Sequence, residues 1–204
     1  DQDTWFAAYS LSNWSMTWST MRFPRASGAY LDLDGDGIRE FLFYATWTSP
    51  APGKSHIYFI DLDAHQVTLN STDMESMFYY GAGTSAMGYR DIDGDGTYEV
   101  VAVARWSTNN TCKAFLYSAS VNESLWVTRS LGDYALKDDV KWADIDGDGV
   151  EEIILILSDP VDDSISKLVI LDPLSGDVIL EYLVNDTFSS GMVYFTDVNG
   201  DGNR

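Results

Sequence analysis

The chain of 204 residues is long enough to bury a sizeable core as one or two domains, and 45% of its residues are hydrophobic. This composition excludes a disordered acidic tail, although 32 acidic residues against 12 Lys and Arg give a formal net charge of −20. The negative charge argues against nucleic acid as a partner, because phosphate binding needs a basic surface. We also expect no membrane span, since the longest aliphatic run, 153–157, is far too short to cross a bilayer.

The N-terminal stretch 1–31 contains two short apolar runs, 5–13 and 15–21, that resemble the two arms of a β-hairpin. A further strand is expected between this hairpin and residue 32. We interpret 1–31 as the closing hairpin of a preceding repeat, followed by the strand that leads into the next one.

The nine residues 32–40 read Asp-Leu-Asp-Gly-Asp-Gly-Ile-Arg-Glu and place carboxylates at positions 1, 3, 5 and 9. Such a cluster of like charge is unfavourable unless a cation sits in it. Oxygen ligands on a flexible loop favour calcium over magnesium, which demands stricter octahedral geometry. Glycines at positions 4 and 6 allow the backbone to turn sharply around the ion. The predicted ligands are Asp32, Asp34, Asp36, the backbone carbonyl of Ile38, and Glu40.

The same pattern returns at 91–99 and 144–152, and a fourth copy begins at residue 197 but is cut off before its ninth position. Successive copies are 59, 53 and 53 residues apart, and a period near 50 is typical of propellers and stacked arrays. The predicted ligands in these three loops are Asp91, Asp93, Asp95, Thr97 (carbonyl) and Glu99; Asp144, Asp146, Asp148, Val150 (carbonyl) and Glu152; and Asp197, Asn199, Asp201 and Asn203 (carbonyl).

The loops have two other possible interpretations. One is an acidic turn that faces solvent and binds nothing, but its repetition at matching offsets argues against it. The other is an EF-hand, whose loop needs a carboxylate at position 12 and a helix on each side. Position 12 is Phe43, Ala102 or Leu155 here, and short β-branched and aromatic runs follow. These runs predict strands, so each loop is expected to join two strands.

The segments after the loops predict the rest of each repeat. The strands that leave the loops are expected at 41–45, 100–104 and 153–157, and each is followed by a hairpin. The arms of the three hairpins are expected at 56–61 and 67–69, at 114–118 and 125–128, and at 167–172 and 178–182.

Four strands per repeat is the composition of a propeller blade, and no helical periodicity of useful length is present. We therefore predict an all-β chain of four-stranded antiparallel blade-like repeats, either β-propeller-like or an open linear array of blades, with calcium loops between strands. The repeats are expected at 32–90, 91–143 and 144–196, with the truncated start of a fourth at 197–204.

The Asp-x-Asp-Gly-Asp-Gly-x-x-Glu loops, at this spacing and between strands, resemble the FG-GAP/VCBS repeats found in integrin α-subunit propellers. The resemblance covers nearly all of 22–204. It implies that the loop carboxylates bind calcium and that the repeats form blades. The implied ligands are Asp32, Asp34, Asp36 and Glu40, with the equivalent sets that start at Asp91 and Asp144. The fourth loop departs from the pattern, with Asn at position 3 and no position 9.

Five Asn-x-Ser/Thr sequons are more than chance predicts for this length, although accidental sequons in Ser- and Thr-rich loops are the alternative. N-glycosylation would place the protein outside the cell or at the cell surface. Weak calcium loops also work best there, where calcium is millimolar. The candidate glycosylation sites are Asn13, Asn70, Asn109, Asn122 and Asn185.

Catalysis finds little support, because the only histidines, His56 and His65, lie near no Ser or Cys that forms a triad pattern. We expect a non-catalytic extracellular calcium-binding repeat glycoprotein that acts as a structural or adhesive scaffold. Its expected partners are other copies of itself, extracellular matrix or cell-surface ligands, or glycans. The alternatives are a carbohydrate-binding, lectin-like propeller and an accessory region of a polysaccharide-degrading enzyme.

The broken fourth loop suggests one further expectation. Joining the end of the sequence to its start gives Asp-Val-Asn-Gly-Asp-Gly-Asn-Arg-Asp, in which Asp1 supplies position 9. We hypothesise that the chain is one period of a longer tandem array, or a filament subunit joined head to tail. A contact of this kind that repeats without closing produces a fibre.

Overall fold

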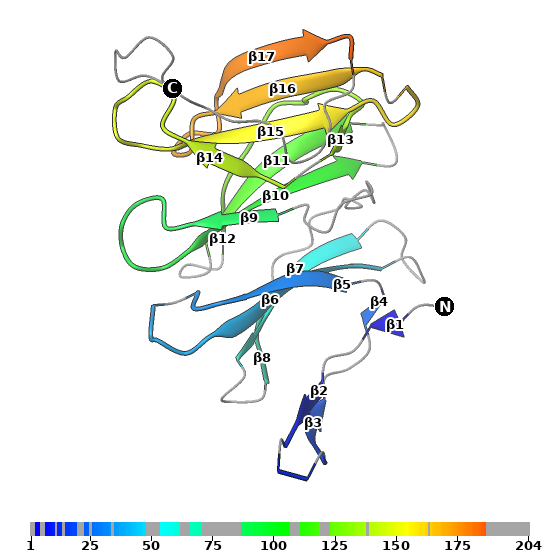
Figure 1. Ribbon diagram of the computed structural model, residues 1–204, viewed down its shortest axis with the longest axis vertical. Coiled ribbons are helices and arrows are strands. Elements are labelled where there is room, and N and C mark those ends of the chain that lie inside the picture. The colour runs from blue at the N-terminus through cyan, green and yellow to red at the C-terminus, as the bar shows by residue number, and fades with distance from the viewer. Residues whose placement is uncertain are drawn as a thin grey trace. The chain divides into compact units, whose positions relative to one another are not determined.

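The computed structural model describes residues 3–4, 7–10, 12–13, 15–19, 23–24, 26–33, 35–47, 54–61, 66–70, 87–106, 111–118, 123–137, 139–162 and 164–186. Every regular element in these ranges is a β-strand and every strand pair is antiparallel, so the predicted all-β class is confirmed for them (Figure 1). None of the residues described belongs to a helix long and apolar enough to cross a membrane. The chain divides into two compact units, Asp1–Met77 and Phe78–Arg204.

The described residues of the first unit form two short strand pairs and one four-stranded sheet. Strand β2 pairs with β3 at the hairpin predicted near the N-terminus, and β1 pairs with β4. The sheet has the order β5-β6-β7-β8, and the loop 32–39 joins its first two strands. The strands are β1 (Asp3–Thr4), β2 (Ala7–Tyr9), β3 (Met16–Ser19), β4 (Phe23–Pro24), β5 (Ala26–Leu31), β6 (Glu40–Trp47), β7 (Lys54–Asp61) and β8 (Gln66–Asn70).

The described residues of the second unit form two sheets in which successive strands are paired in the same order. In the first sheet the order is β12-β11-β10-β9, and in the second β15, β16 and β17 follow one another in the same way. Both β13 and β14 pair with β15, so this sheet has one strand, β13, that the sequence did not predict. The strands are β9 (Met87–Arg90), β10 (Glu99–Trp106), β11 (Thr111–Ser118), β12 (Glu123–Val127), β13 (Ala135–Leu136), β14 (Lys141–Ala143), β15 (Glu152–Ser158), β16 (Ser166–Leu171) and β17 (Val178–Val184).

Strand register explains how each acidic loop closes. The residue before position 1 lies opposite position 9 in all three cases: Leu31 opposite Glu40, Arg90 opposite Glu99, and Ala143 opposite Glu152. Because the two strands are hydrogen-bonded from this pair onward, the ladder itself brings the carboxylate at position 9 back to the start of the loop.

The two sheets of the second unit pack through one face each. Alternate residues of β10 and β15 point into the shared core, as expected for strands with a side-chain period of two. Each fully buried aliphatic side chain stabilises the fold by about 1.5–3 kcal/mol. Burial raises the pKa of the Cys112 thiol to about 12, so this cysteine behaves as a small hydrophobic residue. The core includes Val101, Val103, Leu116, Trp126, Ile153, Leu155, Leu157, Val169 and Leu171.

A turn of the second sheet is fitted closely against the first. The indole nitrogen of Trp126 donates a hydrogen bond to the carbonyl of Pro173 at 2.9 Å. A Cβ atom added to Gly176 would lie 2.6 Å from the same indole ring. The turn 172–177 between β16 and β17 therefore needs a glycine at this point, for space as well as for its φ of 74°.

Candidate metal centres

The glycines at positions 4 and 6 of the three complete loops all adopt positive φ angles. In the second loop (91–99) these angles are 76° and 91°, and in the third loop (144–152) they are 80° and 94°. The first loop (32–40) repeats them at 76° and 88°. A side chain would be strained in this conformation, which explains why glycine occupies both positions in every loop. The sharp turn predicted from the sequence is thus present three times.

Position 1 of each loop organises the turn, because its two carboxylate oxygens accept hydrogen bonds from both glycine amides. Asp91 accepts from the amide nitrogens of positions 4 and 6 at 2.7 and 3.1 Å. Asp144 makes the same two bonds at 2.7 and 3.1 Å, and Asp32 makes them at 2.8 and 2.9 Å. Charge-assisted bonds of this kind hold the loop in one conformation around its first carboxylate.

Position 9 returns to the loop from the strand that follows it. Glu99 accepts a hydrogen bond from the amide of Ile92 at 3.0 Å, and Glu152 accepts one from Ile145 at 2.7 Å. Glu40 makes the equivalent bond to the position 2 amide at 2.8 Å. The three glutamates are only 8%, 3% and 4% exposed in chain order. A buried carboxylate is therefore fixed beside each of the three turns.

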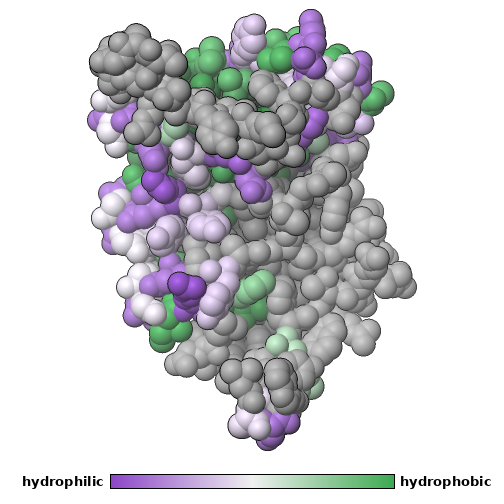
Figure 2. All heavy atoms as spheres, in the orientation of Figure 1, coloured by the Kyte–Doolittle hydropathy of each residue, from purple (hydrophilic) through white to green (hydrophobic). Residues whose placement is uncertain are grey.

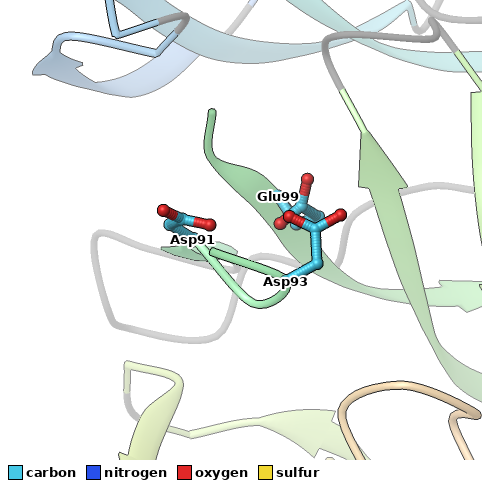
Figure 3. A group of neighbouring side chains, drawn as sticks. All are labelled: Asp91, Asp93 and Glu99. Atoms are coloured by element: carbon cyan, nitrogen blue, oxygen red, sulfur yellow. The ribbon is translucent and has the colours of Figure 1, made fainter. Parts of the chain in front are cut away.

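Carboxylates from positions 1, 3 and 9 come together in the second and third loops. Asp91, Asp93 and Glu99 each have an oxygen within 4.8 Å of the others, and so do Asp144, Asp146 and Glu152. Figure 3 shows the three side chains of the second loop facing a common space. Either group can hold a metal ion. The spacing of the motif predicted both of them.

Position 5 behaves differently from the other three. Asp95 and Asp148 lie outside the two groups, and each accepts a hydrogen bond from the position 7 amide at 2.7 Å. The hydroxyl of Thr97 adds a second bond at 2.6 Å, and this bond does most to hold the pKa of Asp95 below its usual value. Asp36 accepts the equivalent position 7 bond at 2.7 Å. Ligation by any of these carboxylates, and by the carbonyls of Ile38, Thr97 and Val150, stays a prediction.

The electrostatics of the two groups favour a bound cation. Burial raises the pKa of Glu99 above its usual value, and the charges of Asp93, Asp95 and Asp91 raise it further, although the Ile92 amide opposes them. Burial likewise raises the pKa of Glu152, with Asp146 and Asp148 acting in the same sense and the Ile145 amide against it. A divalent cation would offset both effects, and the oxygen-only donor set fits a hard ion such as calcium.

Several predicted residues lie outside the part of the chain that the structure describes. Among the sequons, Asn13 and Asn185 are exposed and Asn70 ends β8. The residues that fall outside the description are Asp34 of the first loop, the fourth-loop residues Asp197, Asn199, Asp201 and Asn203 with Asp1, and the sequons Asn109 and Asn122. Their predicted roles stay predictions.

One feature between the second and third loops could not be found from the sequence. Arg90 forms an ion pair with Glu151, which is position 8 of the third loop. A pocket of about 540 Å³ is lined by residues 90–92 of one segment and by Asp144 and residues 149–151 of the other. Figure 1 shows the two loops on the same side of this unit, and Figure 2 shows hydrophilic residues gathered on that side. Only the folded sheets bring these residues together.

Comparison with known proteins gave no match: no family model, no curated protein and no solved structure resembles this chain closely enough to be counted.

Proposed function

We propose that the protein is a non-catalytic calcium-binding repeat protein, in which calcium ions join neighbouring strands of a scaffold. The observation that carries this proposal is the equivalence of the two carboxylate groups. Asp91, Asp93 and Glu99 occupy the same three loop positions as Asp144, Asp146 and Glu152. Equivalent hydrogen bonds surround both groups, so the arrangement is a property of the repeat.

The position of the groups supports a structural role for the ion. Glu99 and Glu152 are the first residues of β10 and β15, and the next residues of both strands are completely buried. A cation bound at the loop therefore acts on a strand that carries the core. Binding to the folded state alone stabilises that state by mass action.

Calcium is the cation that the proposal names. All donors are oxygens, and the loops supply carboxylates and backbone carbonyls as calcium sites do. Exposed sequons at Asn13 and Asn185 support secretion, and millimolar calcium outside the cell suits loops of modest affinity. The scaffold would then be an extracellular glycoprotein with adhesive or matrix partners, or with other copies of itself.

The repeat architecture proposed for this scaffold is a stack of blade-like sheets, in a propeller or an open array. It is supported by the two sheets of the second unit, which have equivalent strands and loops and share one core. The FG-GAP/VCBS resemblance of the loops is consistent with either arrangement.

A thermal unfolding experiment tests the proposal. We expect calcium to raise the melting temperature by many degrees over the chelated protein, because each site adds about 2.7 kcal/mol at a hundredfold excess over its Kd. Magnesium at the same concentration should give a much smaller increase. Identical melting curves in calcium and in chelator would contradict the proposal.

A further inference from the structure

We propose that the second and third loops bind their cations cooperatively, through direct contacts between the segments that lead into them. All of these contacts lie within the second unit, so the inference concerns its two loops. This inference rests on the proposed function, because it describes how two of the cation sites influence each other.

The first contact joins the strands that precede the two loops. Gly88 lies in β9, three residues before Asp91, and it is buried. A Cβ atom at this glycine would lie 2.6 Å from Cβ of Val140 and 3.3 Å from the indole nitrogen of Trp142. Trp142 lies two residues before Asp144. A shift of β9 must therefore displace β14, because no free space separates these close-packed atoms.

The second contact runs through the shared core. Ile92 is position 2 of the second loop, and its amide donates to Glu99. Its side chain packs against the core cluster that also contains Ile153, the residue after Glu152. Ordering of the second loop by a cation thus fixes Ile92 against the core that carries the third site.

The third contact is the Arg90–Glu151 ion pair. Arg90 directly precedes Asp91, and Glu151 directly precedes Glu152, so the pair links a residue beside one carboxylate group to a residue beside the other. The two side chains are 50% and 33% exposed, so solvent screens the interaction and its share of the coupling is small. The packing contacts are expected to carry most of the effect.

The sign of the coupling follows from two opposing effects. A cation in one loop orders the contacts that the other loop also uses, so the second ion finds a site that is already arranged. Repulsion between the two ions acts in the opposite direction, but salt screens it and leaves the packing contacts unchanged. We therefore expect positive cooperativity at physiological ionic strength, and a stronger effect as salt is raised.

Glycine amide signals in nuclear magnetic resonance spectra of the full chain can report each loop separately. Gly37, Gly96 and Gly149 each donate to the position 1 carboxylate of their own loop. Calcium is titrated into the wild type and into Glu152→Gln, which disables the third loop. The midpoint at Gly96 should rise about fivefold in the variant, the lower end of typical coupling between sites.

Two controls accompany this titration. Glu99→Gln should weaken calcium binding at Gly149 by the same factor, because coupling between two sites is reciprocal. The amide signal of Gly37, in the first loop, should still shift with calcium in both variants, which shows that the substituted chains are folded and bind calcium.

The route of the coupling is tested by two variants that act on the contacts and spare the ligands. Gly88→Ala places a methyl group against Val140 and should abolish most of the coupling. The charge-neutral pair Arg90→Gln with Glu151→Gln should remove a smaller part of it, and this variant keeps the test open if Gly88→Ala does not fold.

The outcomes separate this inference from the proposed function. Equal Gly96 midpoints in wild type and Glu152→Gln, with calcium still binding, would overturn the cooperativity and leave the proposed function standing. A lower midpoint in Glu152→Gln would show that ion repulsion dominates and would overturn it as well. Absence of any calcium-dependent shift at all loops would instead overturn the proposed function.

Discussion

The third loop and the turn 172–177 lie in the same sheet and have similar chemistry, yet only one of them gathers carboxylates. In both, an aspartate carboxylate accepts hydrogen bonds from backbone amides. Asp172 accepts them from Leu174 and Ser175 at 3.0 and 2.7 Å, and Asp144 accepts them from two glycines. Both also contain a glycine with positive φ. Among the residues described, Asp172 belongs to no group that can hold a metal, whereas Asp144 does.

The difference lies in Glu152, which has no counterpart in the turn. It is the first residue of β15, is buried, and accepts a hydrogen bond from the amide of Ile145 in the loop. An acidic turn that satisfies its carboxylate with its own amides is complete without a cation. A loop that also receives a buried glutamate from the next strand holds excess negative charge, and this excess is what a cation relieves.

The largest loss of stability is expected from a substitution in the turn 172–177, and this loss should be independent of calcium. Gly176→Ala forces a methyl group into the Trp126 ring and strains a positive φ, so we expect a loss of about 2–4 kcal/mol in the free energy of unfolding. Urea denaturation in calcium and in chelator should give the same loss.

Gly149→Ala is the matched control in the third loop. Its added methyl group meets no atom within 4 Å, so only strain of about 1–2 kcal/mol is expected. In calcium the loss should be larger, because the substitution also weakens cation binding, and this additional part should vanish in chelator. If the stability lost in Gly176→Ala depended on calcium, the distinction between the turn 172–177 and the third loop would be contradicted.

The second effect is a change in the free energy of unfolding that should be a loss in calcium but not in chelator. Glu152→Gln removes a ligand, so in calcium it should lose about 2.7 kcal/mol at a hundredfold excess over the Kd. In chelator the same variant should be at least as stable as wild type, because burial disfavours the charged Glu152 and a neutral glutamine keeps an oxygen for the Ile145 amide. Asp172→Asn is the control and should show no such reversal.

The third effect is the pH dependence, in chelator, of the difference in stability between Glu152→Gln and wild type. Because the pKa of Glu152 is raised in the folded state, protonation favours folding. This contribution is fully present below the usual pKa of 4.5 and is lost as pH rises through the folded value. The advantage of Glu152→Gln over wild type should therefore be largest near neutral pH and shrink on acidification. An advantage that grows as pH falls would contradict the assignment.

The smallest effect distinguishes positions within one loop. Asp93→Asn alters a member of the carboxylate group, whereas Asp95→Asn alters a residue outside it that already bonds to Thr97. We expect Asp93→Asn to weaken calcium binding at the second loop more than Asp95→Asn does. Titration of the Gly96 amide signal would measure both, and equal effects would mean that position 5 is a full ligand.

The strands and turns could be predicted because their causes are local. The runs 41–45, 100–104 and 153–157 were expected to be strands from their β-branched and aromatic residues, and they lie within β6, β10 and β15. The paired glycines predicted the loop conformation, since few other residues adopt positive φ.

The remaining features depend on contacts between residues far apart in the sequence. Neither the fit of Gly176 against Trp126 nor the Arg90–Glu151 pair leaves a pattern that sequence spacing can reveal. From the loop spacing, position 5 was predicted to be a metal ligand like the other acidic positions. The carboxylate of Asp95 instead accepts a hydrogen bond from the position 7 amide and lies outside the carboxylate group. Short β13 carries too few residues, only Ala135 and Leu136, to produce a periodic signal.

The most direct test of the account is a calorimetric titration of the full chain with calcium, compared with the triple variant Glu40→Gln, Glu99→Gln and Glu152→Gln. The account predicts saturable binding in the wild type, with at least one ion for each complete loop, and loss of that binding in the triple variant. The glutamines retain the size of the side chains and an acceptor for the position 2 amides, so the fold should persist. Undiminished calcium binding by the triple variant would contradict the claim that the buried glutamates make these loops metal sites.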